Sequence, residues 1–117
     1  MRRPRKADAD AAGADERTVR TAALALLAGR DFGCTELARR LERRGYLSGV
    51  VAAVVDGLVA ERLLSDTRYV EQFIRQHAGR GRGPVRIRAD LRERGVPDDE
   101  VDAGLLAAGE DLSLIHI

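Results

Sequence analysis

Apolar residues recur along the chain at the spacing of an α-helix, in runs that glycine or proline interrupts. The first run holds Val19, Ala22, Ala23, Leu26 and Leu27. Positions i, i+3, i+4, i+7 and i+8 lie on one face of a helix, so this run predicts one amphipathic helix. Valine is frequent, but it follows the helical period rather than the alternation of a β-strand. The pattern therefore predicts an all-α protein.

Residues that favour helix ends divide the apolar pattern into six segments. Gly45 and Gly95 follow apolar runs, where glycine suits the left-handed conformation after a last turn. Pro84 and Pro97 suit a first turn, and Ser65 suits an N-cap. The predicted helices span residues 17–28, 35–44, 49–63, 66–78, 84–94 and 97–108.

The chain also repeats itself without a gap at a shift of fifty residues. The matches include Ala28-Gly29-Arg30 with Ala78-Gly79-Arg80, Gly33 with Gly83, Leu41 with Leu91, Arg44-Gly45 with Arg94-Gly95 and Val51 with Val101. They fall at helix ends and core positions, as a duplicated structural unit predicts. A three-helix unit buries little core alone, so neighbouring units are expected to pack together as in solenoids. The first unit is predicted at residues 17–64 and the second at 65–108.

Both ends of the chain lack the apolar period. Residues 1–16 hold charges, alanine and glycine and are expected to form a disordered arm. Residues 109–117 are expected to be a non-native or disordered tail. Residues 112–117, Leu-Ser-Leu-Ile-His-Ile, can be back-translated into a transposon end used as a sequencing adapter. We therefore expect them to be read-through on a truncated gene fragment, packed against nothing.

Charge is dense but nearly balanced, with 20 basic and 19 acidic residues. All the basic residues except Lys6 are arginine, which two explanations fit: the codon usage of a GC-rich genome, or recognition of phosphate and carboxylate groups. Cys34 is the only cysteine, so no disulfide framework is predicted. No apolar run approaches the roughly 20 residues of a membrane span, and no apolar segment follows the basic start. A cytoplasmic protein is expected.

The residue types that carry catalysis are sparse. His77 lies on an apolar helix face, and Cys34 has no nearby histidine to activate it. The glycine-arginine segment 79–83 has no predicted strand before it and no Lys-Ser/Thr after it, so it does not match a P-loop. No catalytic residue, cofactor or metal site is predicted, and we expect a protein that is not an enzyme.

Two sets of motifs indicate a family. The second unit carries Leu64-Ser65-Asp66-Thr67-Arg68-Tyr69, then Phe73, Gly83-Pro84-Val85-Arg86-Ile87, Leu91 and Arg94-Gly95-Val96. The first unit carries Ala25-Leu26-Leu27, Thr35-Glu36-Leu37, Leu41 and Arg44-Gly45-Tyr46. In this order and spacing, over roughly residues 18–108, the chain resembles the RecX family of bacterial regulatory proteins. It departs from the family at Gly33, where a serine cap is usual, and in lacking the third repeat.

The resemblance implies both an architecture and a role. RecX proteins are elongated arrays of three-helix repeats. They are non-enzymatic modulators of the RecA recombinase and bind its filament on single-stranded DNA. They usually inhibit it, limiting recombination and co-protease activity, which implies a part in DNA repair and the SOS response. A cytoplasmic monomer without a cofactor is expected.

A cluster of arginines in the second unit is the candidate contact surface. Its members are Arg75, Arg80, Arg82, Arg86, Arg88, Arg92 and Arg94. Residues 98–111 carry six acids and no base, so charge of both signs is segregated here. An ordinary solvated face and a surface for the RecA filament or for DNA phosphates both fit the cluster. A direct DNA-binding module stays open as the alternative, because a three-helix unit with a basic third element resembles helix-turn-helix architecture.

Overall fold

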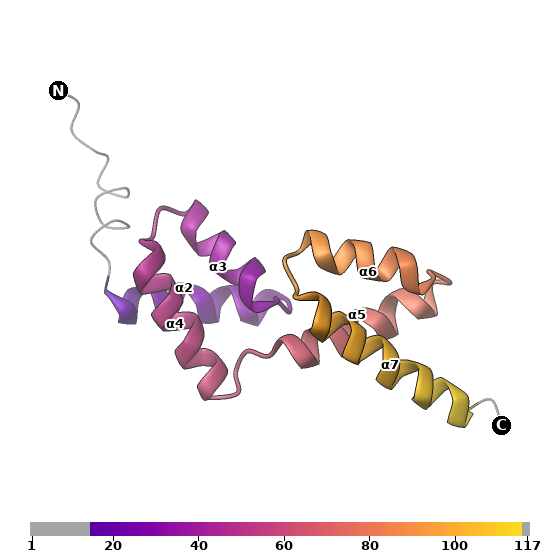
Figure 1. Ribbon diagram of the computed structural model, residues 1–117. Coiled ribbons are helices and arrows are strands. Elements are labelled where there is room, and N and C mark those ends of the chain that lie inside the picture. Colours follow the sequence, from indigo (N-terminus) through magenta and orange to yellow (C-terminus); the bar gives the residue numbers. More distant parts are fainter. Residues whose placement is uncertain (1–14, 116–117) are drawn as a thin grey trace. The chain divides into compact units, whose positions relative to one another are not determined.

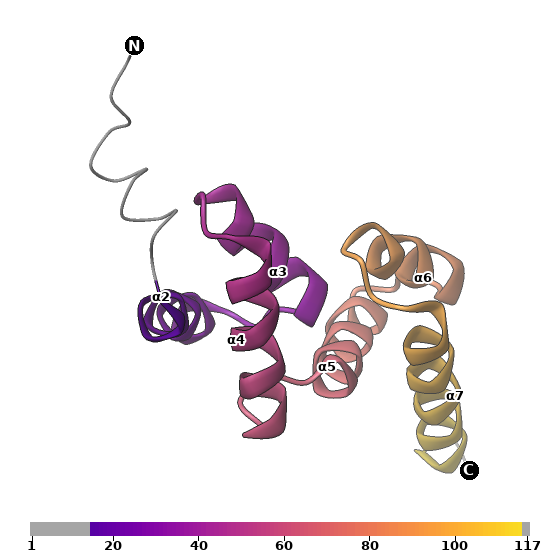
Figure 2. The ribbon, with the colours of Figure 1, turned by 60° about the vertical axis from the view of Figure 1, so that its left-hand side comes forward.

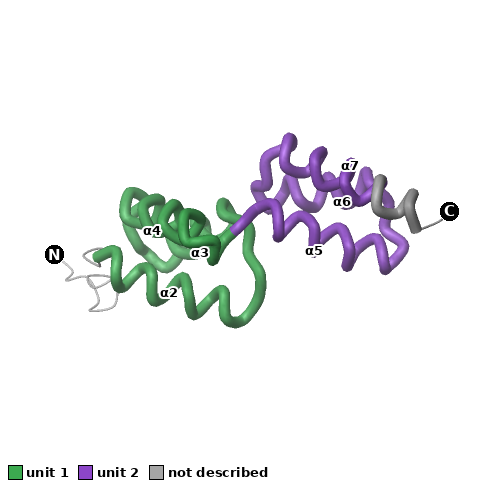
Figure 3. The backbone as a smooth tube through the Cα atoms, turned by 90° about the horizontal axis from the view of Figure 1, so that it is seen from below, with its two compact units in different colours: residues 1–64 green, residues 65–117 purple. Residues whose placement is uncertain are grey.

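The computed structural model describes the backbone of residues 15–115 and the side chains of residues 15–109. Within that range the chain forms six helices and no strand, which confirms the predicted all-α class (Figure 1). The helices are α2 (Glu16–Gly29), α3 (Cys34–Arg43), α4 (Ser48–Ala60), α5 (Asp66–Gly79), α6 (Pro84–Glu93) and α7 (Asp98–Ile115). They form two compact units, Met1–Leu64 and Ser65–Ile117, each with three helices (Figure 3).

The fifty-residue repeat is present in the helix boundaries and in the backbone. The helices α5, α6 and α7 begin fifty residues after α2, α3 and α4, respectively. After the middle helix of each unit the chain turns at a left-handed glycine, with φ of 99° at Gly45 and 84° at Gly95. The N–H of Gly45 donates to the Glu42 carbonyl and that of Gly95 to the Arg92 carbonyl, both at 2.9 Å. Each unit therefore ends its middle helix in the same way.

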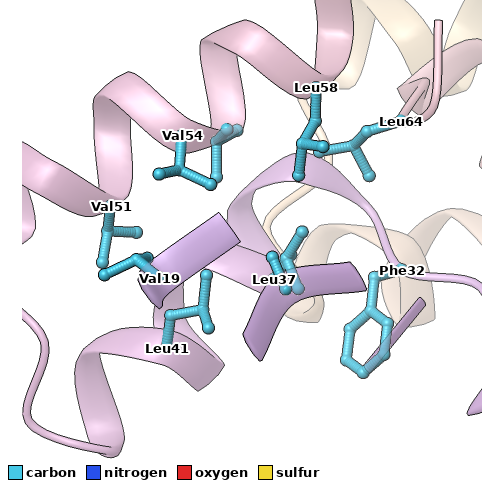
Figure 4. Close-up of a cluster of buried hydrophobic side chains, with 10 residues drawn as sticks. Val19, Phe32, Leu37, Leu41, Val51, Val54, Leu58 and Leu64 are labelled. Carbon is cyan, nitrogen blue, oxygen red and sulfur yellow. The ribbon is translucent and has the colours of Figure 1, made fainter. Parts of the chain in front are cut away.

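The core of unit 1 lies where its three helices meet. Figure 2 views α2 nearly along its axis and α4 from the side, so these two helices cross steeply. The buried side chains are Val19, Ala23, Phe32, Leu37, Leu41, Val51, Val54, Val55, Leu58 and Leu64 (Figure 4). Leu64 comes from the segment after α4 and is 2% exposed, so this segment folds back onto the core.

Unit 2 shares three central core positions with unit 1 but differs from it in its aromatic residues. Ile87, Leu91 and Val101 are buried as their counterparts in unit 1 are. In unit 1 the buried phenylalanine is Phe32, from the segment between α2 and α3. In unit 2 it is Phe73, which lies on α5 itself. Helix α5 also buries Tyr69, so the core of unit 2 contains two buried aromatic rings and that of unit 1 contains one.

The third helix of each unit ends elsewhere than predicted. Helix α4 ends at Ala60 rather than near residue 63, because Arg62 adopts a left-handed conformation with φ of 62°. The N–H of Leu63 then donates to the Leu58 carbonyl at 2.9 Å and closes the helix end. Helix α7 continues past Ala108 to Ile115. A glycine such as Gly109 weakens a helix by only about 1 kcal/mol and does not have to end it.

The two predicted terminal segments fare differently. Asp15 caps α2 by accepting a hydrogen bond from the N–H of Thr18 at 3.0 Å, so the helix begins at Glu16, inside the arm expected to be disordered. Residues 1–14 lie outside the described part of the chain. The expected exposure of side chains 112–117 lies outside it as well, whereas their backbone is helical as far as Ile115.

Candidate partner-binding surface

The glycine-arginine segment between α5 and α6 forms a hydrogen-bonded turn. Gly81 takes the left-handed conformation, with φ of 78°. Its N–H donates to the Ala78 carbonyl at 2.9 Å, and the N–H of Arg82 donates to the His77 carbonyl at 3.0 Å. Gly83 then serves as the N-cap of α6, with proline in the first turn. The hydrogen bonds of this turn therefore fix the backbone positions of Arg80 and Arg82.

Arg82 is held by a histidine that lies in an aromatic stack. The ring of His77 stacks on Phe73 with 3.9 Å between centroids. Nη1 of Arg82 forms a hydrogen bond with Nδ1 of His77. Burial, and then the positive charge of Arg82 and Arg80, lower the pKa of His77. The neutral ring can keep its proton on Nε2 and accept the hydrogen bond from Arg82 at Nδ1.

Arg88 and Arg92 pair with acids at the start of α7. Nε and Nη2 of Arg92 donate to Oδ1 and Oδ2 of Asp98 at 3.1 and 3.0 Å. This forked bond lowers the pKa of Asp98 and raises that of Arg92. Arg88 forms an ion pair with Asp102. Exposed pairs of this kind add little stability, but each neutralises the charge of its arginine.

Arg94 faces the core of unit 2. Its Nη1 donates to the hydroxyl of Tyr69 at 3.0 Å. Its guanidinium carbon lies 4.9 Å from the centroid of the Phe73 ring, within the range of a cation–π contact. These contacts indicate that Arg94 stabilises unit 2.

Arg75, Arg80 and Arg86 are the remaining members of the cluster. All are exposed, and none forms a hydrogen bond or ion pair through its side chain with any residue that the structure describes. Val85 precedes Arg86 and is 85% exposed. Arg80, Val85 and Arg86, where α5 passes into α6, are named the α5–α6 surface below. The structure thus places all seven arginines in unit 2 but engages four of them internally.

The third helix of each unit carries no basic residue. Helix α4 spans Ser48–Ala60 with Asp56 as its only charge. Helix α7 begins with three acids and contains no lysine, arginine or histidine. In a helix-turn-helix protein the recognition helix enters the major groove against the phosphates. The predicted basic third element is therefore wrong, and arginine is most frequent on the middle helix of each unit, with three on α3 and three on α6.

Sequence reasoning missed arginines on the middle helix of unit 1. Arg40, Arg43 and Arg44 are exposed at the C-terminal end of α3. Their i, i+3, i+4 spacing would have shown that they share one side of a helix. No group of histidine, cysteine and acidic side chains among the described residues is arranged to hold a metal. Over the same residues no helix is long and apolar enough to cross a membrane.

The fold and these surfaces define a class of protein, a tandem three-helix repeat with charged surfaces on its middle helices. Residues 65–105 match the family model of the second three-helix domain of RecX. The regulatory protein RecX of Halorhodospira halophila is 47% identical over 100 residues, which are 86% of this chain and 62% of that protein. That of Pseudomonas savastanoi is 43% identical over 93 residues, 80% of this chain and 60% of its own length. The chain belongs to the RecX family.

A solved structure agrees with the fold. The crystal structure of RecX from Lactobacillus salivarius superposes with a TM-score of 0.75 at 21% identity, over 80% of this chain and 61% of that one. The identity is low, so this likeness concerns the fold. The chain spans about three fifths of the length of the relatives named above.

Proposed function

We propose that this protein regulates the RecA recombinase by binding the RecA filament on single-stranded DNA. The observation that carries the proposal is the 47% identity to a regulatory protein RecX over 100 residues. In this proposal the protein is a monomer that acts by binding rather than by catalysis. It limits recombination and co-protease activity in the cytoplasm, where it takes part in DNA repair and the SOS response.

The α5–α6 surface is the part of the arginine cluster that best fits a contact with the filament. Arg80 and Arg86 have no internal partner among the described residues, so their charge is available. Val85, which precedes Arg86 in α6, adds an exposed apolar side chain. Exposed apolar and arginine side chains together suit a protein partner that presents acidic groups. Arg75 is a further exposed arginine on α5, whereas Arg82, Arg88, Arg92 and Arg94 are occupied within unit 2.

Direct DNA binding in the helix-turn-helix manner is the weaker candidate. The helix that would enter the major groove carries no basic residue in either unit. A contact with DNA phosphates through a middle helix does not need that geometry, and the exposed arginines of α3 favour it.

The proposal is tested by following ATP hydrolysis by RecA on single-stranded DNA as this protein is added. We expect the parent to inhibit hydrolysis. The Arg80→Ala/Arg86→Ala variant should need about thirtyfold more protein for the same inhibition, since truncating a central interface arginine costs about 2 kcal/mol. The Arg88→Ala/Arg92→Ala variant is the matched control, and it should lose less than about threefold because both arginines already have partners.

The outcomes separate the two parts of the proposal. If the parent changes neither hydrolysis nor filament assembly, the regulatory role is wrong. If the parent inhibits and the Arg80→Ala/Arg86→Ala variant inhibits equally well, the role stands and the contact lies elsewhere on the protein.

A further inference from the structure

Three arginines at the end of α3 form a basic patch in unit 1. Arg40, Arg43 and Arg44 are all exposed. Arg43 is the last residue of α3 and Arg44 is its C-cap. None of the three side chains bonds to a residue that the structure describes. Residues at i, i+3 and i+4 are neighbours on a helix surface, so their charges reinforce one another. This set is named the α3 arginine patch.

The equivalent face of unit 2 has the opposite charge. Fifty residues on from the patch stand Asp90, Glu93 and Arg94. Two of these are acids, and the third donates to the hydroxyl of Tyr69. The α3 arginine patch of unit 1 therefore has no basic counterpart at the equivalent positions of unit 2.

The third helix also differs between the units. In unit 2, Asp98 and Asp102 at the start of α7 neutralise two arginines of α6. Unit 1 has neither side of these pairs, because Ala38 and Glu42 stand at the positions of Arg88 and Arg92, and Ser48 and Ala52 at those of Asp98 and Asp102. On α3 itself, Glu36 pairs with Arg30 at 3.1 Å, and Glu42 is the remaining acid. The patch thus keeps a net positive charge that the fold does not neutralise.

The surroundings of the patch fit a phosphate backbone better than a folded protein. Among the described residues the exposed large apolar side chains are Leu24, Leu47, Val59, Leu63, Val85 and Leu106; none lies on α3, and Leu47 follows it as the N-cap of α4. A protein interface usually has an apolar centre. Binding to a nucleic-acid backbone needs none, because its free energy comes largely from releasing the counterions of the phosphates. Guanidinium groups also form forked hydrogen bonds to phosphate oxygens.

We infer that the α3 arginine patch binds the phosphodiester backbone of a nucleic acid strand, without regard to base sequence. This contact is separate from the α5–α6 surface and involves no helix in the major groove. The patch binds the nucleic acid in the absence of any other protein.

The test measures binding of the whole protein to a dye-labelled oligothymidylate by fluorescence anisotropy over a series of salt concentrations, with no RecA present. The Arg40→Gln/Arg43→Gln/Arg44→Gln variant should bind at least tenfold more weakly at low salt. Its plot of log affinity against log salt should flatten by about 2, since each phosphate contact to a single strand adds about 0.7 to the slope. The single Arg43→Gln variant should show about a third of that flattening, which keeps the test valid if the triple variant is poorly folded.

The matched control removes the same charge from the middle helix of the other unit. The Arg86→Gln/Arg88→Gln/Arg92→Gln variant should lose less than about threefold, because two of its arginines are already paired. An equal loss in both triple variants would mean that only total charge matters and would overturn the inference. So would unchanged binding by the α3 variant, an absence of binding by the parent, or equally effective competition by polyglutamate, which would point to an acidic protein. RecA is absent, so the result is independent of the proposed regulatory role.

Discussion

A Cβ atom on Gly104 of α7 would overlap Cγ1 of Val70 on α5. It would also lie 3.2 Å from Cδ1 of Ile74. Gly104 therefore lets α7 approach α5 closely, and a larger residue at this position forces the two helices apart. Val70 is β-branched and cannot easily rotate away.

We expect Gly104→Ala to lower the free energy of unfolding by about 1–2 kcal/mol, because the overpacking of a core outweighs the better helix propensity of alanine. Urea unfolding followed by circular dichroism measures the change. Gly57→Ala in α4 is the control, because no atom lies within 4 Å of the added Cβ there. That variant should gain about 0.5–1 kcal/mol. A Gly104→Ala variant as stable as Gly57→Ala would show that α5 and α7 are not closely packed.

Arg62 carries backbone strain at the end of α4, since its φ is 62°. A residue with a Cβ loses about 1–2 kcal/mol in this conformation, and glycine does not. Arg62→Gly should therefore raise the free energy of unfolding by about 0.5–1 kcal/mol, after the greater freedom of glycine in the unfolded chain is subtracted. Arg62→Ala removes the same side chain but keeps the strain. If both variants change stability equally, the side chain rather than the backbone is responsible.

Arg94 should behave differently from the other arginines of its cluster. Its bond to the Tyr69 hydroxyl and its position over Phe73 predict that Arg94→Ala costs about 1–2 kcal/mol of stability. Arg86→Ala, at an exposed position, should stay within about 0.5 kcal/mol. A double-mutant cycle with Tyr69→Phe should show a coupling of about 1 kcal/mol. A coupling near zero would contradict the hydrogen bond.

The lowered pKa of His77 predicts a loss of stability in mild acid. The unfolded chain, in which the pKa is near the ordinary value of 6.5, takes up its proton first as the pH falls, and the folded state is disfavoured in consequence. Stability should therefore decline between about pH 7.5 and about pH 5.5. His77→Gln should reduce that decline, as measured by urea unfolding at each pH. Asp98 does not contribute in this window, because its lowered pKa moves its titration to more acid pH.

The helix boundaries that could be predicted are those set by local chemistry. Ser65 accepts a hydrogen bond from the N–H of Arg68 at 3.2 Å, as an N-cap should. Pro84 begins α6, and Gly45 and Gly95 turn the chain after α3 and α6. The end of α4 was not predictable in this way, because an arginine took the left-handed position that usually holds glycine.

The state of each arginine in the candidate surface depended on contacts between helices. In the sequence the seven arginines of the cluster look alike, since each is a charged residue outside the apolar stripe. The structure separates Arg92, which Asp98 neutralises, from Arg86, which has no partner among the described residues. Arg94 lies closer to the core than either, against Tyr69 from another helix.

The sequence by itself determined the helices and their duplication, because the 3.6-residue period, the caps and the fifty-residue shift are all properties of neighbouring or repeated residues. Only the tertiary structure decided which charges are available to a partner. An ion pair such as Arg88 with Asp102 needs α6 and α7 to pack against each other. Likewise, only the tertiary structure shows that the side chains of Arg40 and Arg43 bond to no residue that it describes.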